Sequence, residues 1–326
     1  MSGLPGARVL VTGGSGLLGS HVCDALLAAG VSELVVLDNF VRGRRHHLDD
    51  ASGKGRVRIV DGSVSDAALV ATLMEGIDYL AHLAALRVTR CEEDPAACFD
   101  VMVQGTHTVL AAAAKAKVRK TLYASSVVAY GQPVREPMDE EHPLGSDNFY
   151  GAAKIAGEYF CRAQRRSAGL PYVALRYFNM YGPRMSIEGK DTEVLIKWLE
   201  KLEAGEAPVI HGDGSATIDW VHVRDAARAS VLALTQPADG EAVNVASGRA
   251  TSLRELLELL IELTGSPVKP RYEAARAVYA GARRVGSPEK AKRLLGFEAK
   301  IGLREGLGEL IAWYRDSKPK RAGTTA

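Results

Sequence analysis

The first residues whose types and spacing could do chemistry are Tyr150 and Lys154, four positions apart. On a helix this spacing puts both side chains on one face, where an ammonium beside a phenol stabilises the phenolate. Because the pKa of free tyrosine is about 10, such a neighbour lowers the pKa of Tyr150 and makes it a usable acid or base at neutral pH. Tyr-x-x-x-Lys alone is a common and usually structural pattern, so its meaning depends on its surroundings.

A second candidate is the glycine-rich segment 12–19, which follows the apolar run 8–11 and precedes a helical pattern. Gly13, Gly16 and Gly19 have the spacing G-x-x-G-x-x-G. Glycine lets the backbone approach a pyrophosphate, and the N-terminus of the next helix supplies N–H groups and the positive end of its dipole. Glycines alone would indicate only a tight turn, but the strand before them and the helix after them favour a dinucleotide site.

A carboxylate that could select the cofactor is Asp38, which ends the second apolar run nineteen positions after Gly19. It can accept hydrogen bonds from both ribose hydroxyls of an adenosine and repels a 2′-phosphate, so we expect NAD rather than NADP. An aspartate in a strand-end turn is the structural alternative. Arg42, Arg44 and Arg45 weaken the exclusion of NADP, although such a basic run is more often a solvated loop.

The elements that must position these residues alternate along the first half of the chain. Strand-like apolar runs occupy 8–11, 34–37, 57–60, 79–82, 121–125 and 172–177, and helical patterns between them include 95–115 and 150–166. This alternation predicts an α/β protein, a Rossmann-type doubly wound parallel sheet with a smaller, discontinuous C-terminal lobe. We expect an NAD-binding domain at 1–178 with a return segment near 219–248, a substrate-binding lobe at 179–218 and 249–317, and a frayed tail at 318–326.

Composition narrows the class of protein. Lys+Arg 41 against Asp+Glu 39 leave a net charge of +2, which argues against a nucleic-acid partner. The four cysteines form no CxxC and no Cys/His pattern with zinc spacing, so we expect neither a metal site nor a disulfide scaffold. No apolar stretch reaches the ~18 residues of a membrane span. The N-terminus does not have the pattern of a signal peptide, so we expect a cytoplasmic protein.

Several short motifs occur in order along the chain. They are Gly13-x-x-Gly16-x-x-Gly19, Asp38-Asn39, His82-Leu83-Ala84-Ala85, Ser125-Ser126-x-x-x-Tyr130-Gly131, Tyr150-x-x-x-Lys154 and the segment 175–184. Together they resemble the extended short-chain dehydrogenase/reductases, specifically the NAD-dependent nucleotide-sugar epimerase/dehydratase family, and within it the UDP-glucose 4-epimerases. The resemblance runs from about Arg8 to Trp313.

The resemblance implies the residues of the site. Ser126, Tyr150 and Lys154 would be catalytic, the substrate a nucleotide-diphosphate sugar (most often UDP-linked), and the protein a homodimer paired through the helices at 95–115 and 150–166. Cofactor contacts are expected from Gly13, Gly16, Leu17, Leu18, Asp38, Asn39, Ser63, Val64, Leu83, Ala84, Ala85, Ala124, Tyr150, Lys154 and Tyr177. Substrate contacts are expected from Arg87, Ser126, Tyr150, Asn179, Arg184, Arg283 and Arg284.

Three positions depart from the family pattern. Met102 replaces the Asn of an Asn-Val-x-Gly-Thr element, and Ser63 replaces an Asp that meets the adenine. Ile218 stands where the family has an Arg that contacts the nucleotide. Either one of the substrate-site arginines at 184, 283 and 284 substitutes for it, or the nucleotide is bound differently.

The function that these residues predict is that of a nucleotide-sugar 4-epimerase, which oxidises C4 transiently with tightly bound NAD and returns the hydride to either face. In the family's 4,6-dehydratases an Asp-Glu pair follows the catalytic Ser/Thr, and the decarboxylating members carry a Glu there. Here Val127 and Val128 have no proton to give or take. A dehydratase or 4-keto reductase of the same family is the alternative. A catalytically silent NAD(H)-binding regulatory protein is a third possibility, opposed by the three catalytic residues.

Overall fold

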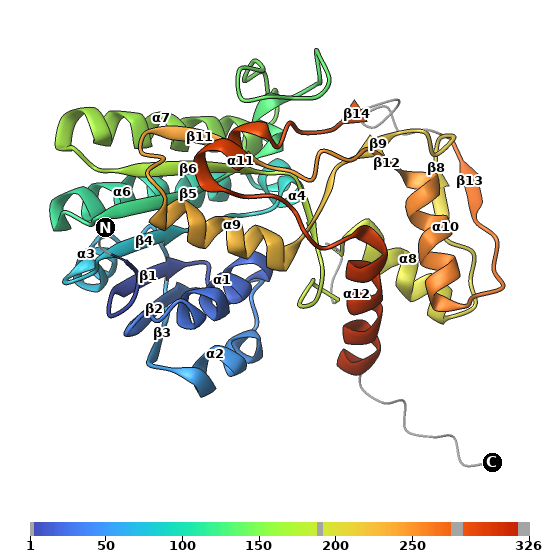
Figure 1. The fold of residues 1–326 in the computed structure, drawn as a ribbon, viewed down its shortest axis with the longest axis horizontal. Helices are drawn as coiled ribbons and strands as arrows, with labels where there is room; N and C mark the ends of the chain where they lie inside the picture. The colour runs from blue at the N-terminus through green and yellow to red at the C-terminus, as the bar shows by residue number, and fades with distance from the viewer. Residues whose placement is uncertain (1–2, 188–191, 275–282, 319–326) are drawn as a thin grey trace.

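Seven parallel strands form the central sheet of the protein (Figure 1). The structure, a computed structural model, describes residues 3–187, 192–274 and 283–318. The strand order is β11-β6-β5-β4-β1-β2-β3. In chain order the strands are β1 Arg8–Thr12, β2 Glu33–Asp38, β3 Val57–Asp61, β4 Tyr79–His82, β5 Lys120–Ser126, β6 Tyr172–Tyr177 and β11 Glu241–Val245. The order reverses between β1 and β4, so the predicted Rossmann-type doubly wound sheet is confirmed.

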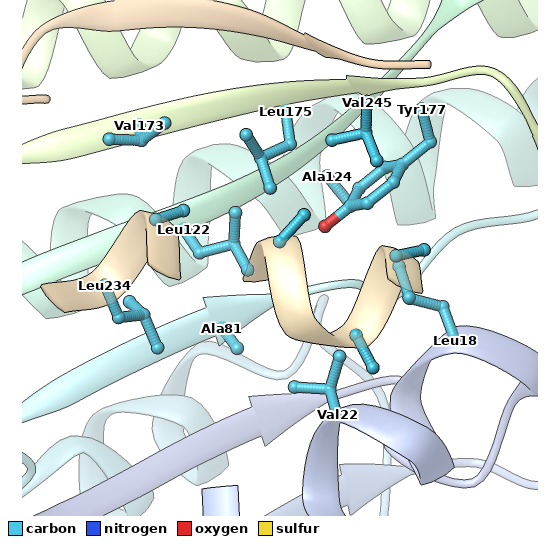
Figure 2. Close-up of a cluster of buried hydrophobic side chains, with 14 of the residues drawn as sticks. Leu18, Val22, Ala81, Leu122, Ala124, Val173, Leu175, Tyr177, Leu234 and Val245 are labelled. Atoms are coloured by element: carbon cyan, nitrogen blue, oxygen red, sulfur yellow. The ribbon is translucent and has the colours of Figure 1, made fainter. Parts of the chain in front are cut away.

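Helices cover both faces of this sheet. On one face lie α1 (Leu17–Ala28), α2 (Asp49–Lys54), α9 (Val223–Thr235) and α11 (Glu289–Leu295); on the other lie α3 (Ala67–Met74), α6 (Gly105–Ala116) and α7 (Phe149–Ala168). Figure 2 shows part of the first layer, in which Leu122, Leu175 and Val245 of the sheet meet Val22 of α1 and Leu234 of α9. Burial on both faces explains why the strands are continuously apolar.

A smaller lobe packs beside the carboxyl edge of the sheet. Its core is made by α8 (Val194–Glu203), α10 (Leu253–Thr264) and α12 (Leu303–Ser317). Ser252 and Glu255 form a capping box at the start of α10. The strands of the lobe are only two or three residues long: β7 Asn179–Tyr181, β8 Val209–His211, β9 Thr217–Ile218, β10 Trp220–His222, β12 Thr251–Ser252, β13 Arg271–Glu273 and β14 Arg283–Arg284. Between these segments the chain returns to the sheet through α9 and β11.

The helix expected at 95–115 is interrupted. A short helix α4 (Val88–Glu93) comes first, then α5 (Pro95–Cys98), a π-helical segment Phe99–Gln104 and α6. At the end of the π-helical segment a Cβ on Gly105 would lie 2.6 Å from Cγ2 of Val64, so the backbone comes close to the loop after β3. A π-helical turn inside a helix commonly marks a functional region, and this one lies against α7.

No helix in the described ranges is both long and apolar enough to cross a membrane.

Candidate active site

The glycine turn after β1 is closely packed. Gly13 has φ +71°, and a Cβ there would lie 2.7 Å from Cα of Ala84. A Cβ on Gly19 would lie 2.1 Å from the carbonyl oxygen of Gly13. At Gly16, the N-cap of α1, the nearest such contact is 3.4 Å, and no side chain caps the first N–H groups of the helix. The turn therefore leaves backbone N–H groups for a pyrophosphate at the point where the strand order reverses.

Asp38 lies buried beside this turn. Its Oδ2 accepts a hydrogen bond from the backbone N–H of Ser15 at 2.9 Å, and its Oδ1 accepts one from Phe40 at 2.9 Å. The carboxylate thus holds both the glycine turn and its own loop in place. In the basic run that follows, Arg42 pairs with Glu193 at 2.8 Å. Arg45 pairs with Asp61 at 3.3 Å, so both guanidinium groups already face carboxylates.

His82, at the end of β4, is a core histidine. Its Nδ1 lies 2.7 Å from Oγ1 of Thr12 and its Nε2 lies 3.0 Å from Oγ1 of Thr106. Burial lowers the pKa of His82 to about 3, so the ring is neutral at physiological pH. The side chain ties β4 to β1 and α6.

The end of β5 and the start of α7 bring Ser126 and Tyr150 together. Ser126 is the last residue of β5, and its Oγ accepts a hydrogen bond from Val128 N at 3.2 Å to cap the next turn. Asn148 caps α7 through Gly151 N at 2.9 Å, which fixes the first turn of the helix that carries Tyr150. The hydroxyl group of Ser126 is near enough to that of Tyr150 to oppose part of the rise in the tyrosine pKa.

Lys154 lies one turn further along α7. Its Nζ donates to the carbonyl oxygen of Ala124 at 2.6 Å and lies 5.6 Å from the centre of the Tyr150 ring. Burial lowers the pKa of Lys154 to about 8. The pKa of Tyr150 is raised, because burial outweighs the effect of the Ser126 hydroxyl. The expected lowering of the tyrosine pKa is therefore wrong for the protein alone: the lysine is bound to a backbone carbonyl.

Sequence reasoning missed a buried ion pair behind the site. Arg176 of β6 binds Glu158 of α7 through two hydrogen bonds of 2.9 and 2.7 Å, and both side chains are 2–3% exposed. Ser125 also donates to Glu158 at 2.5 Å, and Arg176 reaches the Tyr130 hydroxyl at 3.0 Å. An arginine inside a fully buried strand was the available signal, because a buried charge requires a partner.

A second missed residue is Asp219, between β9 and β10. Its carboxylate is fully buried and accepts hydrogen bonds from Ser247 N at 2.8 Å, Ser247 Oγ at 2.6 Å, Gly248 N at 2.9 Å and Gly286 N at 3.2 Å. Its carbonyl oxygen accepts from Asn179 N at 3.2 Å. Through its carboxylate and its backbone carbonyl, this one residue joins the ends of β7, β11 and β14.

The predicted substrate arginines lie in different environments. Arg184, at φ +68°, pairs with Asp24 at 2.7 Å and with Asp50 at 2.8 Å, so its guanidinium ties the segment after β7 to α1 and α2. The exposed Arg283 pairs with Glu136 at 2.7 Å. Asn179 begins β7. Arg87 directly precedes α4, and its guanidinium lies 3.5 Å from the carboxylate of Glu193. Arg284 is the Cα partner of Ile218 in the parallel pair of β9 and β14.

Most of the remaining residues predicted to contact the cofactor lie along the carboxyl edge of the sheet. Asn39, the pair Ser63 and Val64, and the run Leu83, Ala84 and Ala85 directly follow β2, β3 and β4, while Ala124 lies in β5 and Leu17 begins α1. Two side chains turn inward. Leu18 packs in the core, and the Tyr177 hydroxyl lies 2.8 Å from Oγ of Ser230 on α9 (Figure 2).

Known proteins similar to this chain identify its family. The model of the NAD dependent epimerase/dehydratase family matches residues 9–246. The chain belongs to this family. It is 34% identical over 312 residues to the UDP-glucose 4-epimerase of Mycolicibacterium smegmatis, an alignment that covers 95% of this chain and 99% of that one. It is 29% identical over 325 residues to the dTDP-glucose 4,6-dehydratase of an Actinoplanes species, which covers 95% of this chain and 98% of that one. The solved UDP-glucose 4-epimerase of Thermotoga maritima with UDP-glucose is 32% identical, with a TM-score of 0.88 over 95% of this chain and 99% of that one.

NAD is the cofactor of this family, and the residues described above fit it. The glycine turn and the uncapped start of α1 would hold the pyrophosphate, and Asp38 would meet the adenosine ribose. When bound, the nicotinamide supplies a hydride acceptor. In the described part of the chain, no group of three or more His, Cys, Asp or Glu side chains could hold a metal ion.

Proposed function

We propose that the protein is a nucleotide-sugar 4-epimerase acting on UDP-linked sugars. Tyr150 takes the proton of the C4 hydroxyl while Ser126 hydrogen-bonds the same oxygen. The glycine turn and the start of α1 would hold NAD, which would supply the acceptor for the C4 hydride and would have to stay bound through the cycle. The hydride would return to the opposite face of the 4-keto sugar, and Tyr150 gives the proton back.

The observation that favours epimerisation is that no acid or base directly follows Ser126 in the sequence. Val127 is buried and Val128 packs against the same core cluster, so the two positions directly after the proposed catalytic serine carry only apolar side chains. Elimination of water from a 4-keto sugar needs a base for the C5 proton and an acid for the leaving hydroxyl. The nearby carboxylate of Glu158 is held by Arg176 in the core. Without an acid and a base for elimination, the 4-keto sugar can only be reduced again at C4.

The products of UDP-glucose turnover test this assignment. We expect a product of unchanged mass, by mass spectrometry, with C4 inverted, by NMR. A loss of 18 mass units, or release of carbon dioxide from a uronic acid substrate, would refute epimerisation and leave the fold and the cofactor standing.

Arg284 is the residue that replaces the arginine lost at position 218. Register partners on adjacent parallel strands present their side chains to the same face, so Arg284 lies where the Ile218 side chain points. Its Nε is buried and, among the described residues, has no hydrogen-bond partner. An Arg fork suits the oxygens of a diphosphate.

A matched pair of variants separates the two neighbouring arginines. Arg284→Met should raise the KM for the UDP-sugar about 10-fold or more, the effect of losing a charged hydrogen bond. Arg283→Met should change it little, because that side chain is exposed and paired with Glu136. Equal effects in steady-state kinetics would remove Arg284 from the substrate site.

The proposed homodimer would bury an apolar surface on α4, the π-helical segment and α7. Val88, Phe99, Phe149 and Tyr159 stand there, 38–59% exposed. Sedimentation should show a dimer that Phe99→Asp converts to monomer; a monomeric wild type would contradict it.

We place the reaction in the cytoplasm. All four cysteines, Cys23, Cys91, Cys98 and Cys161, are free and buried thiols. Reduced thiols persist in that compartment.

A further inference from the structure

Three sulfur atoms meet beside Tyr150, and the proposed chemistry uses none of them. Sγ of Cys91 lies 3.5 Å from Sδ of Met102, and Sγ of Cys98 lies 3.9 Å from the same atom. Both thiols thus donate to the same thioether sulfur. All three side chains are at most 2% exposed, and they form one cluster with Ala153 against which the Tyr150 ring packs.

The backbone around these sulfur atoms is well fixed. Cys91 lies on α4 and Cys98 ends α5, and the residue between the two helices, Asp94, caps α5 through Ala97 N at 3.0 Å. Met102 comes from the π-helical segment, at one of the positions where the sequence departs from its family. The three ligand atoms are therefore brought together by three consecutive pieces of backbone, before anything binds.

We propose that Cys91, Cys98 and Met102 form a site for one soft monovalent metal ion, Cu(I) or Ag(I). Thiolate and thioether sulfur select such ions over the hard cations that prefer oxygen. Three metal–sulfur bonds of about 2.3 Å at about 120° to one another would separate the sulfur atoms by about 4.0 Å. The separations of 3.5 and 3.9 Å already come close to this arrangement.

Binding must exchange protons for the metal. One M⁺ ion entering the site displaces the protons of both thiols and leaves a complex with one net negative charge, so two protons are released per ion. The nearby ammonium of Lys154 favours that negative charge. The donor set contains no hard ligand, which opposes Mg²⁺ and Ca²⁺.

An occupied site would act on catalysis through its charge. The cluster packs against Tyr150, and a negative complex there opposes the negative charge that the tyrosine oxygen carries during proton transfer. This consequence rests on the proposed function, whereas metal binding does not. We expect turnover to fall at least ~10-fold when the site is filled; unchanged turnover in a filled enzyme would overturn this consequence alone.

Competition with a chromogenic chelator tests the site directly. Reduced protein is titrated without oxygen against the Cu(I) complex of bicinchoninate, and X-ray absorption at the copper edge counts the sulfur ligands. We expect one Cu(I) per chain bound by three sulfur atoms at about 2.3 Å. Met102→Leu keeps the apolar volume and removes the thioether, so we expect at least ~10-fold weaker binding and only two sulfur ligands.

Another cysteine provides the control. Cys161→Ala removes a buried thiol that belongs to a different core cluster and should leave Cu(I) affinity unchanged, while Cys91→Ser with Cys98→Ser should abolish binding. Failure of the wild type to take Cu(I) from the chelator would overturn the proposal. So would a Met102→Leu variant with undiminished affinity and an unchanged sulfur count; this variant decides the matter even if the double serine variant does not fold.

Discussion

The two sides of the candidate site are built differently. On the sheet side, Asp38 and Ser126 are the last residues of the buried strands β2 and β5, so a local sequence pattern determines where they lie. On the lobe side, the pair Arg284 and Ile218 depends on two-residue strands that are far apart in the chain and joined through Asp219. The comparison indicates that the proposed catalytic residues lie on locally encoded elements, while the proposed substrate contacts depend on a tertiary network.

The largest effect should come from the sheet side. Tyr150→Phe removes the hydroxyl and keeps the ring, so we expect turnover to fall at least ~100-fold, the lower range for acid–base catalysis, while NAD binding survives. Steady-state kinetics and calorimetric titration with NAD give the two quantities. Full activity would remove Tyr150 from the reaction.

The buried pair behind the sheet side should dominate stability. Glu158→Gln leaves Arg176 charged and unpaired in the core, which should lower the free energy of unfolding by about 3–5 kcal/mol in urea denaturation. The exposed pair of Arg165 and Asp239, 3.1 Å apart, is the control, and Arg165→Met should cost about 1 kcal/mol or less. If both variants lower the free energy of unfolding by the same amount, the buried pair stabilises the protein no more than an exposed pair does.

A smaller and different effect should come from the lobe side. In Asp219→Asn an amide NH₂ replaces one acceptor oxygen and faces backbone N–H donors. This should lower the free energy of unfolding by about 1–3 kcal/mol. Because Asp219 is bonded beside the proposed substrate contacts and not beside the proposed proton-transferring groups, we expect the KM for the UDP-sugar to rise more than kcat falls. Asp213→Asn, a change in an exposed turn, should leave both KM and kcat nearly unchanged. A selective loss of kcat would contradict the division between the two sides.

The sequence could predict the doubly wound parallel sheet and the glycine turn after its first strand, because each depends on a local pattern. The catalytic roles of Ser126, Tyr150 and Lys154 stay predictions. The sequence could not predict the direction of the Tyr150 pKa shift, since this follows from burial and from the bond that Lys154 makes to Ala124. Nor could it choose among the arginines. Arg184 meets two carboxylates from distant segments, and Arg284 meets Ile218 only through strand register. The π-helical segment Phe99–Gln104 also could not be predicted, because the local sequence pattern is that of an ordinary helix.

The central claim is that hydride leaves C4 and returns to C4, and a deuterium label tests it most directly. UDP-glucose carrying deuterium at C4 is converted by the enzyme, and the product is analysed by NMR and mass spectrometry. We predict a C4-inverted product of unchanged mass that retains deuterium at C4. Deuterium at C6 with loss of 18 mass units would show elimination followed by hydride return at C6, and would contradict the epimerase mechanism.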